Sequence, residues 1–198
     1  MYIPAFNRIE DETISWALMR EFNFALLVTA PDSVPFATSV PFTILEAERK
    51  ITTHVARANP QWQHLEPQRE VLIVFQGEHA FVSPRWYEHA PQVPTWNYAT
   101  VHAYATPRLL NDTETRAQLE ALMTQHAHGE DMDALPETYL EKMQRGIVAV
   151  EFSVTRLEGK LKLSQNKSVQ DQKTVVAKLE AQGELERGVA ARMKANLE

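Results

Sequence analysis

Stretches of alternating or continuous apolar residues fill the middle of the chain, whereas stretches with helical spacing lie near both ends. A period of two, or a short apolar run bounded by turn residues, is typical of β-strands. Pro41 interrupts one such stretch, which indicates an edge strand or a bulge. Gly77 and the pair Glu158-Gly159 are expected to end strands at turns. Strands are therefore predicted over residues 24–29, 36–45, 51–56, 70–76, 79–83, 96–109, 147–155 and 160–164.

Capping residues mark the predicted helix starts. Asp11 and Ser168 each precede apolar residues at helical spacing, and Asn111 with Glu114 has the spacing of a capping box. The helix that begins at Asn111 is expected to end at Gly129, and further helices are predicted over residues 136–145 and 184–197. Strands in the middle with helices around them favour an antiparallel barrel with helices packed outside. Neither G-x-G-x-x-G nor a P-loop sequence is present.

The composition of the 198 residues is that of an ordinary globular protein. The absence of cysteine excludes disulfides and thiolate chemistry. No apolar run reaches the ~18 residues of a membrane span, and no signal peptide is recognisable, so a cytoplasmic protein is expected. Residues 1–155 carry eleven Lys/Arg against twenty Asp/Glu, and residues 156–198 carry nine against six. The acidic body opposes non-specific DNA binding, while the basic tail could meet a small anion or form a solvated helix surface.

The stretch from His54 to Trp62 follows a predicted strand, which Asn59-Pro60 stops in a fixed loop. Arg57, His54 and free backbone N–H groups in such a loop could hold a phosphate. The alternative is a strand-to-helix corner in which Trp62 packs on the core and Arg57 is solvated.

Two further stretches combine chemistry of interest. Ser83, Trp86 and Tyr87 precede the run Thr-Trp-Asn-Tyr at residues 95–98. Aromatics beside hydrogen-bonding groups can hold a flat ring, although they could equally belong to a core or a dimer interface. The run Lys-Leu-Ser-Gln-Asn-Lys at residues 162–167 lies between a strand and a capped helix. Such a run can bind a phosphate or the carbonyl edge of a heterocycle, or it can be a solvated polar loop.

Metal, hydrolase and direct DNA-binding chemistry have less support. His126 and His128 are followed by Glu130 and Asp131, but side chains two residues apart point to different sides of a helix. Without an H-E-x-x-H spacing, no metal site is expected. The sequence holds no nucleophile elbow and no helix-turn-helix pair with a basic second helix. Direct DNA binding is therefore doubtful.

Several long motifs resemble the PaiB family of FMN-binding negative transcriptional regulators. They are residues 1–4 (Met-Tyr-Ile-Pro), 54–62 (His-Val-Ala-Arg-Ala-Asn-Pro-Gln-Trp), 74–77, 79–84, 86–87, 93–98 (Val-Pro-Thr-Trp-Asn-Tyr), 101–104 and 162–166 (Lys-Leu-Ser-Gln-Asn). The resemblance implies an α+β, mainly β fold: a six-stranded antiparallel Greek-key split β-barrel with peripheral helices. It implies a single domain over residues 1–198, with a helical C-terminal extension from about residue 168, and a homodimer with FMN at its interface.

The resemblance also implies which residues lie at the cofactor: His54, Arg57, Asn59, Trp96, Asn97, Lys162, Ser164, Gln165 and Asn166. Arg57 would take the FMN phosphate, with His54 and Asn59 nearby. Trp96 and its neighbour would lie near the isoalloxazine, from the same or the partner subunit, and the residues of the 162–166 run would contact the phosphate or the ring edge. Lys is expected at the position of Arg57 in this family; because Arg keeps the charge and adds a planar fork, phosphate binding should survive.

Three functions follow from this resemblance and these residues. The first is negative regulation of transcription by a flavin-binding dimer. The second is an FMN-dependent oxidoreductase or flavin reductase that uses NAD(P)H, in which the flavin carries out the chemistry and the protein positions it. The third is a haem-binding split barrel with His102 or His126 as an axial ligand.

Overall fold

A computed structural model of the protein describes residues 1–88, 91–126 and 136–197. It has an α+β fold in which one antiparallel sheet is the main element. The chain divides into two compact units. Unit 1 consists of Met1–Ser15, Gln76–Val101 and Glu158–Glu198, and unit 2 consists of Trp16–Phe75 and His102–Leu157. None of the described helices is long and apolar enough to cross a membrane.

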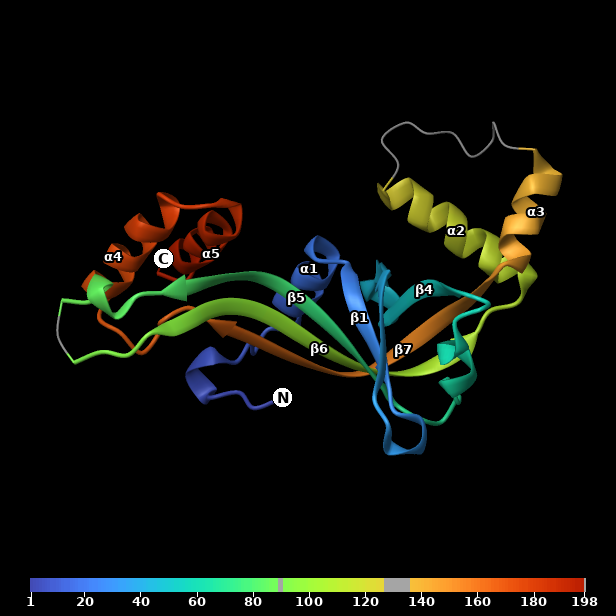
Figure 1. The fold of residues 1–198 in the computed structure, drawn as a ribbon, viewed down its shortest axis with the longest axis horizontal. Helices are drawn as coiled ribbons and strands as arrows, with labels where there is room; N and C mark the ends of the chain where they lie inside the picture. Colours follow the sequence, from blue (N-terminus) through green and yellow to red (C-terminus); the bar gives the residue numbers. More distant parts are fainter. Residues whose placement is uncertain (89–90, 127–135, 198) are drawn as a thin grey trace. The chain divides into compact units, whose positions relative to one another are not determined.

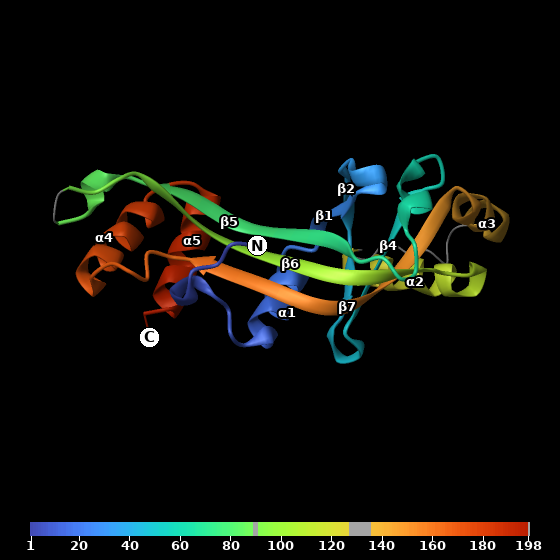
Figure 2. The ribbon, with the colours of Figure 1, turned by 90° about the horizontal axis from the view of Figure 1, so that it is seen from below.

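Seven strands of the described chain form the sheet, in the order β2-β1-β5-β6-β7-β4-β3. They are β1 (Phe24–Thr29), β2 (Phe36–Pro41), β3 (Thr43–Leu45), β4 (Lys50–Ala56), β5 (Val71–Val82), β6 (Thr95–Leu109) and β7 (Ile147–Lys162). Figures 1 and 2 both show β6 between β5 and β7. The expected six strands become seven because the chain changes partner after Pro41: β2 pairs with β1, whereas β3 pairs with β4. Pro41 lacks the N–H needed to continue the first ladder.

Two predicted strand breaks are wrong. At Gly77 the strand continues as β5, because glycine also adopts extended backbone; the buried positions shift there from odd-numbered residues up to Gly77 to the even-numbered Ala80 and Val82. At Gly159 the strand continues as β7. The N-terminal segment crosses there: the Ile9 N–H donates to the Gly159 carbonyl at 3.1 Å. A Cβ on Gly159 would lie 2.5 Å from the Ser15 hydroxyl, so this glycine permits a close approach of two segments and makes no turn.

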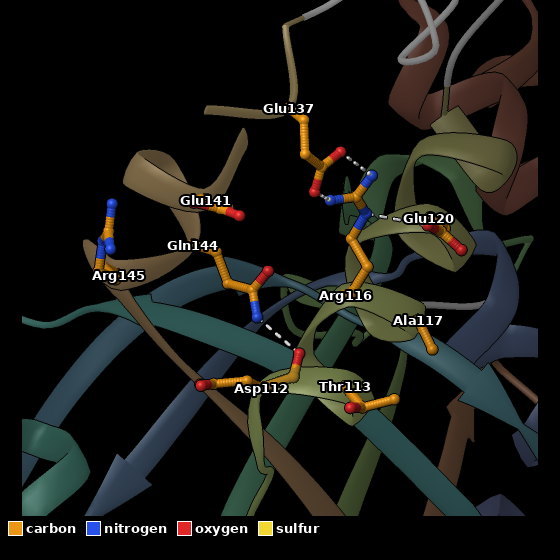
Figure 3. A pocket seen from close by; sticks show the side chains of 9 residues that line it. All are labelled: Asp112, Thr113, Arg116, Ala117, Glu120, Glu137, Glu141, Gln144 and Arg145. Carbon is orange, nitrogen blue, oxygen red and sulfur yellow. Dashed lines mark hydrogen bonds and ion pairs between the residues drawn. The ribbon is translucent and has the colours of Figure 1, made fainter. Parts of the chain in front are cut away.

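Unit 2 has an aromatic core and two helices. The Phe42 ring lies 5.6 Å from that of Phe75 and 6.2 Å from that of Phe152, and all three side chains are buried. The predicted capping box is confirmed: Asn111 and Glu114 exchange backbone-to-side-chain hydrogen bonds of 2.9 and 3.0 Å. The helix it starts is α2 (Asp112–His126), and its predicted end at residue 129 lies outside the described residues. Figure 3 shows the side chains through which α2 faces α3 (Glu137–Arg145).

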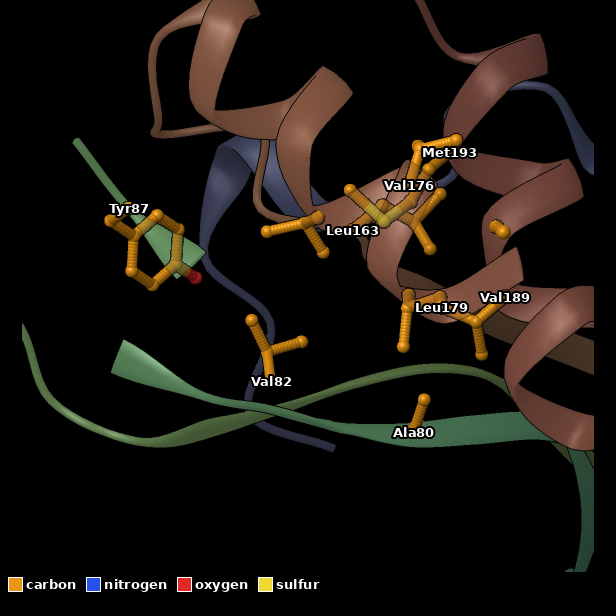
Figure 4. Close-up of a cluster of buried hydrophobic side chains, with 10 residues drawn as sticks. Ala80, Val82, Tyr87, Leu163, Val176, Leu179, Val189 and Met193 are labelled. Carbon is orange, nitrogen blue, oxygen red and sulfur yellow. The ribbon is translucent and has the colours of Figure 1, made fainter. Parts of the chain in front are cut away.

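Unit 1 buries its apolar side chains against a helix pair. The helices α4 (Val169–Glu180) and α5 (Glu184–Ala195) lie side by side, in red in Figure 1. Figure 4 shows the cluster beneath them, to which the helices contribute Val176, Leu179, Val189 and Met193, and β5 contributes Ala80 and Val82. Burying one such aliphatic side chain stabilises the fold by roughly 1.5–3 kcal/mol. The predicted cap of α4 is confirmed, because the Asp171 N–H donates to the Ser168 hydroxyl at 3.0 Å.

The first helix, α1 (Glu12–Glu21), also follows its predicted cap. The Thr13 N–H donates to the Asp11 carboxylate at 2.9 Å, which lowers the pKa of Asp11. Such bonds satisfy N–H groups that have no partner within a helix.

Candidate functional site

Unit 1 holds a cavity of about 220 Å³ where the N-terminal segment meets the turn that follows β7. We call it the lysine pocket, because two lysines line it together with polar and apolar side chains. Its lining residues are Pro4, Phe6, Asn7, Tyr87, Val93, Thr95, Lys162, Ser164, Asn166 and Lys167. The pocket thus collects three of the sequence-predicted residues, Lys162, Ser164 and Asn166.

The turn after β7 owes its shape to its own side chains. Ser164 has left-handed backbone with a φ of 64°, and its carbonyl accepts from the Lys167 N–H at 2.9 Å. Gln165 accepts from the Leu163 N–H at 2.7 Å and donates to the Leu161 carbonyl at 2.6 Å. Both polar ends of the Gln165 side chain are therefore used within the turn, so we interpret it as a positioning residue for the turn.

Asn97, on β6, is fully buried. Its amide nitrogen lies 3.0 Å from the Ser164 hydroxyl and 3.4 Å from the sulfur of Met193 on α5. The Ser164 hydroxyl in turn lies 3.2 Å from the Asn97 amide oxygen. Asn97 thus links the turn to the strand and to α5, whereas its neighbour Trp96 is exposed.

Lys162 is a half-buried cation beside the pocket. Its ammonium donates to the Thr95 hydroxyl and to the Trp96 carbonyl. Burial lowers the pKa of Lys162, and the charge of Lys160 lowers it further. Removing the ammonium from water disfavours its charged form. An anion bound beside it would favour that form again and would itself be attracted to the charge.

Trp96 offers an exposed aromatic surface in unit 1. Its side chain is 52% exposed, and its ring centroid lies 6.0 Å from those of His79 and Phe81 on β5. These side chains point away from Ala80 and Val82, which pack under the helices, because successive residues of a strand face opposite sides. A flat ligand could stack on this surface.

The Arg57 loop lies in unit 2. The guanidinium of Arg57 donates to the carbonyls of Arg145 and Ile147 at 2.9 and 2.8 Å, and its side chain is exposed. Two of its five N–H donors are thereby used, which fixes the fork and leaves the others available. Asn59 accepts from the Gln61 N–H at 3.0 Å and donates to the Thr38 hydroxyl at 3.0 Å, so it shapes the loop.

His54 precedes this loop on β4. Burial lowers the pKa of His54, and the side chain of Gln118 on α2 partly offsets that effect. The neutral imidazole is therefore the stable form near neutral pH. A neutral, half-buried ring contributes no permanent charge toward a phosphate, which leaves Arg57 as the cation of this loop.

The nine predicted residues thus divide between the units, with His54, Arg57 and Asn59 in unit 2 and the other six in unit 1. Four polar lining residues of the lysine pocket were not among the nine predicted residues: Asn7, Tyr87, Thr95 and Lys167. Tyr87 and Lys167 stood in the aromatic and polar runs that were singled out. Nothing in the pattern marked Asn7, whose side chain becomes part of the pocket because the N-terminal segment crosses β7 near Gly159.

A second, larger cavity of about 710 Å³ lies at α2 and α3 in unit 2. Figure 3 shows its central contacts: Arg116 donates to Glu120 at 3.0 Å and to Glu137 at 2.9 Å. Gln144 donates to the backbone carbonyl of Asp112 at 2.5 Å. These contacts link the helices and pair the arginine with two carboxylates, so the cavity has no evident ligand chemistry of its own.

No group of three or more His, Cys, Asp or Glu side chains within the described ranges could hold a metal ion. Of the histidine motif considered above, His126 is the last residue of α2. His128, Glu130 and Asp131 lie outside the described residues.

Comparison with known proteins places these features in a family. The family described as "Putative FMN-binding domain" matches residues 1–156. The "Protease synthase and sporulation protein PAI 2" of Bacillus subtilis (strain 168) is 33% identical over 186 residues, which cover 91% of this chain and 89% of that protein.

Two solved structures share the fold at 14% sequence identity. The flavocytochrome Anf3 from Azotobacter vinelandii aligns with a TM-score of 0.69, and the aligned region covers 86% of this chain and 77% of that chain. The FAD and heme binding protein from Mycobacterium smegmatis has a TM-score of 0.67, with 84% and 78% covered.

Proposed function

Because the chain belongs to this FMN-binding family, with a PaiB-like protein as its relative, we propose that it acts as an FMN-binding homodimer that negatively regulates transcription. FMN is its cofactor. One observation of the structure supports the cofactor most directly. Trp96 exposes half of its surface beside two further rings, and the ammonium of Lys162 is bonded to the Trp96 carbonyl. An isoalloxazine needs such a combination: a flat surface for stacking and a donor for its carbonyl edge.

The proposed contacts follow the geometry of each residue. Arg57 takes the FMN phosphate, since its fork is already anchored to two carbonyls and a phosphate suits the remaining donors. Lys162, Ser164 and Asn166 contact the ring edge. Trp96 stacks on the ring. His54, Asn59, Asn97 and Gln165 position these groups through the hydrogen bonds described above.

The bound flavin supplies hydride or one-electron transfer. The residues of this chain would bind, orient and shield it. Lys162 donates hydrogen bonds toward the carbonyl edge, which favours added negative charge at that edge, and Trp96 excludes water from one ring face. A six-stranded Greek-key split β-barrel is the fold we propose for the chain.

Regulation through a partner protein is favoured over direct operator binding. Residues 1–155 carry a net negative charge, and such a surface repels phosphates. A gel-shift assay with fragments of the organism's own promoters at physiological salt tests this point. A shift that weakens steeply with added salt would show that the protein binds DNA itself.

An FMN-dependent oxidoreductase using NAD(P)H is the second candidate. The exposed Trp96 surface favours it, because a nicotinamide could reach a flavin bound there without a dedicated dinucleotide fold. NAD(P)H oxidation by the FMN-loaded protein decides between the two functions, since a regulator should show only trace turnover.

The central test is a titration of the protein with FMN, monitored by the quenching of FMN fluorescence. One site is expected per subunit. Trp96→Ala and Arg57→Ala should each weaken FMN binding about tenfold or more, the loss typical of a charged or stacking contact. Arg69→Ala is the matched control, because Arg69 is also exposed and also donates to a backbone carbonyl, that of Ala30 at 3.0 Å. Unchanged affinity in both test variants would refute the proposed site.

A further inference from the structure

Three lysines of unit 1 are held by neutral groups. Lys162 donates to a hydroxyl and a carbonyl, and Lys167 donates to the Gln92 side chain at 2.6 Å. The buried ammonium of Lys160 lies 3.3 Å from the Tyr2 carbonyl and 5.2 Å from the Tyr98 ring centroid. Within the described residues, no carboxylate forms an ion pair with any of the three. Lysines that are withdrawn from water are normally paired with a carboxylate, so these three ammonium groups are available to an anionic ligand.

Two polar groups of the lysine pocket have no hydrogen-bond partner among the described residues. One is the side-chain oxygen of Asn7, a residue 3% exposed, and the other is the hydroxyl of Tyr87, a residue 8% exposed. The Lys167 ammonium lies 5.0 Å from the Tyr87 ring centroid. Buried polar groups are nearly always satisfied, so these two point to a ligand or water in the pocket. The Tyr87 hydroxyl can donate to an oxyanion, whereas the Asn7 oxygen is an acceptor and would need a donor from the ligand or from water.

The pocket is also small and partly apolar. Its volume of about 220 Å³ falls below the roughly 300–1,000 Å³ of sites that enclose a drug-sized ligand. It is therefore suited to a compact molecule and too small to enclose a whole flavin mononucleotide. Pro4, Phe6 and Val93 supply an apolar wall beside the lysines. A small organic anion, with one charged end and an apolar body, matches both walls.

We propose that the lysine pocket binds the carboxylate or phosphate group of a small organic ligand other than FMN, held by Lys167, Lys162 and the Tyr87 hydroxyl. The pocket shares Lys162, Ser164 and Asn166 with the proposed flavin site, so this inference rests in part on the proposed function. It gives that site a second ligand, an anion bound beside the flavin.

Isothermal titration with benzoate and with inorganic phosphate tests the pocket directly. We expect one site per chain in the wild type, loaded with FMN or free of it. Lys167→Met should weaken binding on the order of tenfold, as the loss of a charge-assisted contact does, and Tyr87→Phe several-fold. Lys178→Met, an exposed lysine in the last turn of α4, is the matched control and should leave binding unchanged. Thermal melting of each variant checks that it is folded.

The outcomes separate the possible sources of the anion. Absence of binding by both probes would overturn the oxyanion site. Competition of phosphate with FMN but not with riboflavin, which lacks the phosphate, would show that the pocket seats the flavin's own phosphate and would overturn a separate ligand. A protein that takes up no FMN but binds benzoate through Lys167 would support the pocket and refute the proposed flavin site.

Discussion

Asn97→Ala tests whether Asn97 positions the turn after β7 or contacts the flavin. The substitution removes the amide bonded to the Ser164 hydroxyl at 3.0 Å and leaves that hydroxyl buried without its partner. The lost hydrogen bond contributes about 1 kcal/mol, and the unsatisfied hydroxyl costs about 1–3 kcal/mol. We therefore expect a loss of roughly 2–4 kcal/mol in the free energy of unfolding. For a chain of this size that lowers the melting temperature by roughly 4–16 °C.

The first measurement is urea unfolding of the FMN-free protein, monitored by tryptophan fluorescence. The second is an FMN titration at a temperature below the melting range of the variant. Asn166→Ala is the control for the unfolding measurement alone, because Asn166 is exposed in the same turn and should change stability by less than about 0.5 kcal/mol. If Asn97→Ala weakened FMN binding while the unfolding midpoint stayed at the wild-type value, Asn97 would be a flavin contact, and the positioning role would be refuted.

Three further substitutions test other parts of the structure. Gly159→Ala would place a methyl group 2.5 Å from the Ser15 hydroxyl, so urea unfolding should show a loss of roughly 1–3 kcal/mol; a neutral result would mean that the N-terminal segment does not cross β7 there. Arg192 donates to the Glu78 carboxylate at 2.6 Å, so Arg192→Met would leave that carboxylate without its partner. The free energy of unfolding should fall by roughly 3 kcal/mol, and adding Glu78→Gln should recover part of the loss. Because burial lowers the pKa of His54 in the folded state, the stability tied to its neutral form is present above the unfolded pKa of about 6.5 and is lost as pH falls through the lower folded value. The urea midpoint of His54→Gln should therefore fall less than that of the wild type as the pH is lowered below about 6.5, and equal slopes would contradict this assignment.

The sequence predicted most elements because local signals and burial agreed. The caps at Asp11, Asn111 and Ser168 each form the predicted hydrogen bond, and the run of residues 24–29 is β1. Gly77 and Gly159 misled because glycine is compatible both with a turn and with an extended strand that another segment approaches closely. Which of the two occurs depends on residues far away in the sequence, such as Ile9 at Gly159.

Individual site roles were harder to predict, because a polar side chain in a motif can bind a ligand or hold the motif together. The side chains of Gln165 and Asn97 form hydrogen bonds with other groups of the protein. Lys167 and Tyr87 stood in the polar and aromatic runs but were not assigned to the cofactor site. The roles proposed for them rest on burial and on missing hydrogen-bond partners, which only the folded chain defines.

The basic tail illustrates the same point and bears on the choice of function. The sequence left open whether its excess of Lys and Arg meets an anion or solvent. In the structure the tail cations fall into different classes: Arg192 and Lys194 are paired with Glu78 and Glu180, and Lys178 is exposed. Lys160, Lys162 and Lys167 lack a carboxylate partner among the described residues and are at least partly buried. Duplex DNA is bound by cations that reach outward to successive phosphates, whereas Lys162 and Lys167 line one small pocket, which suits a single small anion. Of the two possibilities that the sequence left open, these lysines therefore favour the small anion over a solvated helix surface.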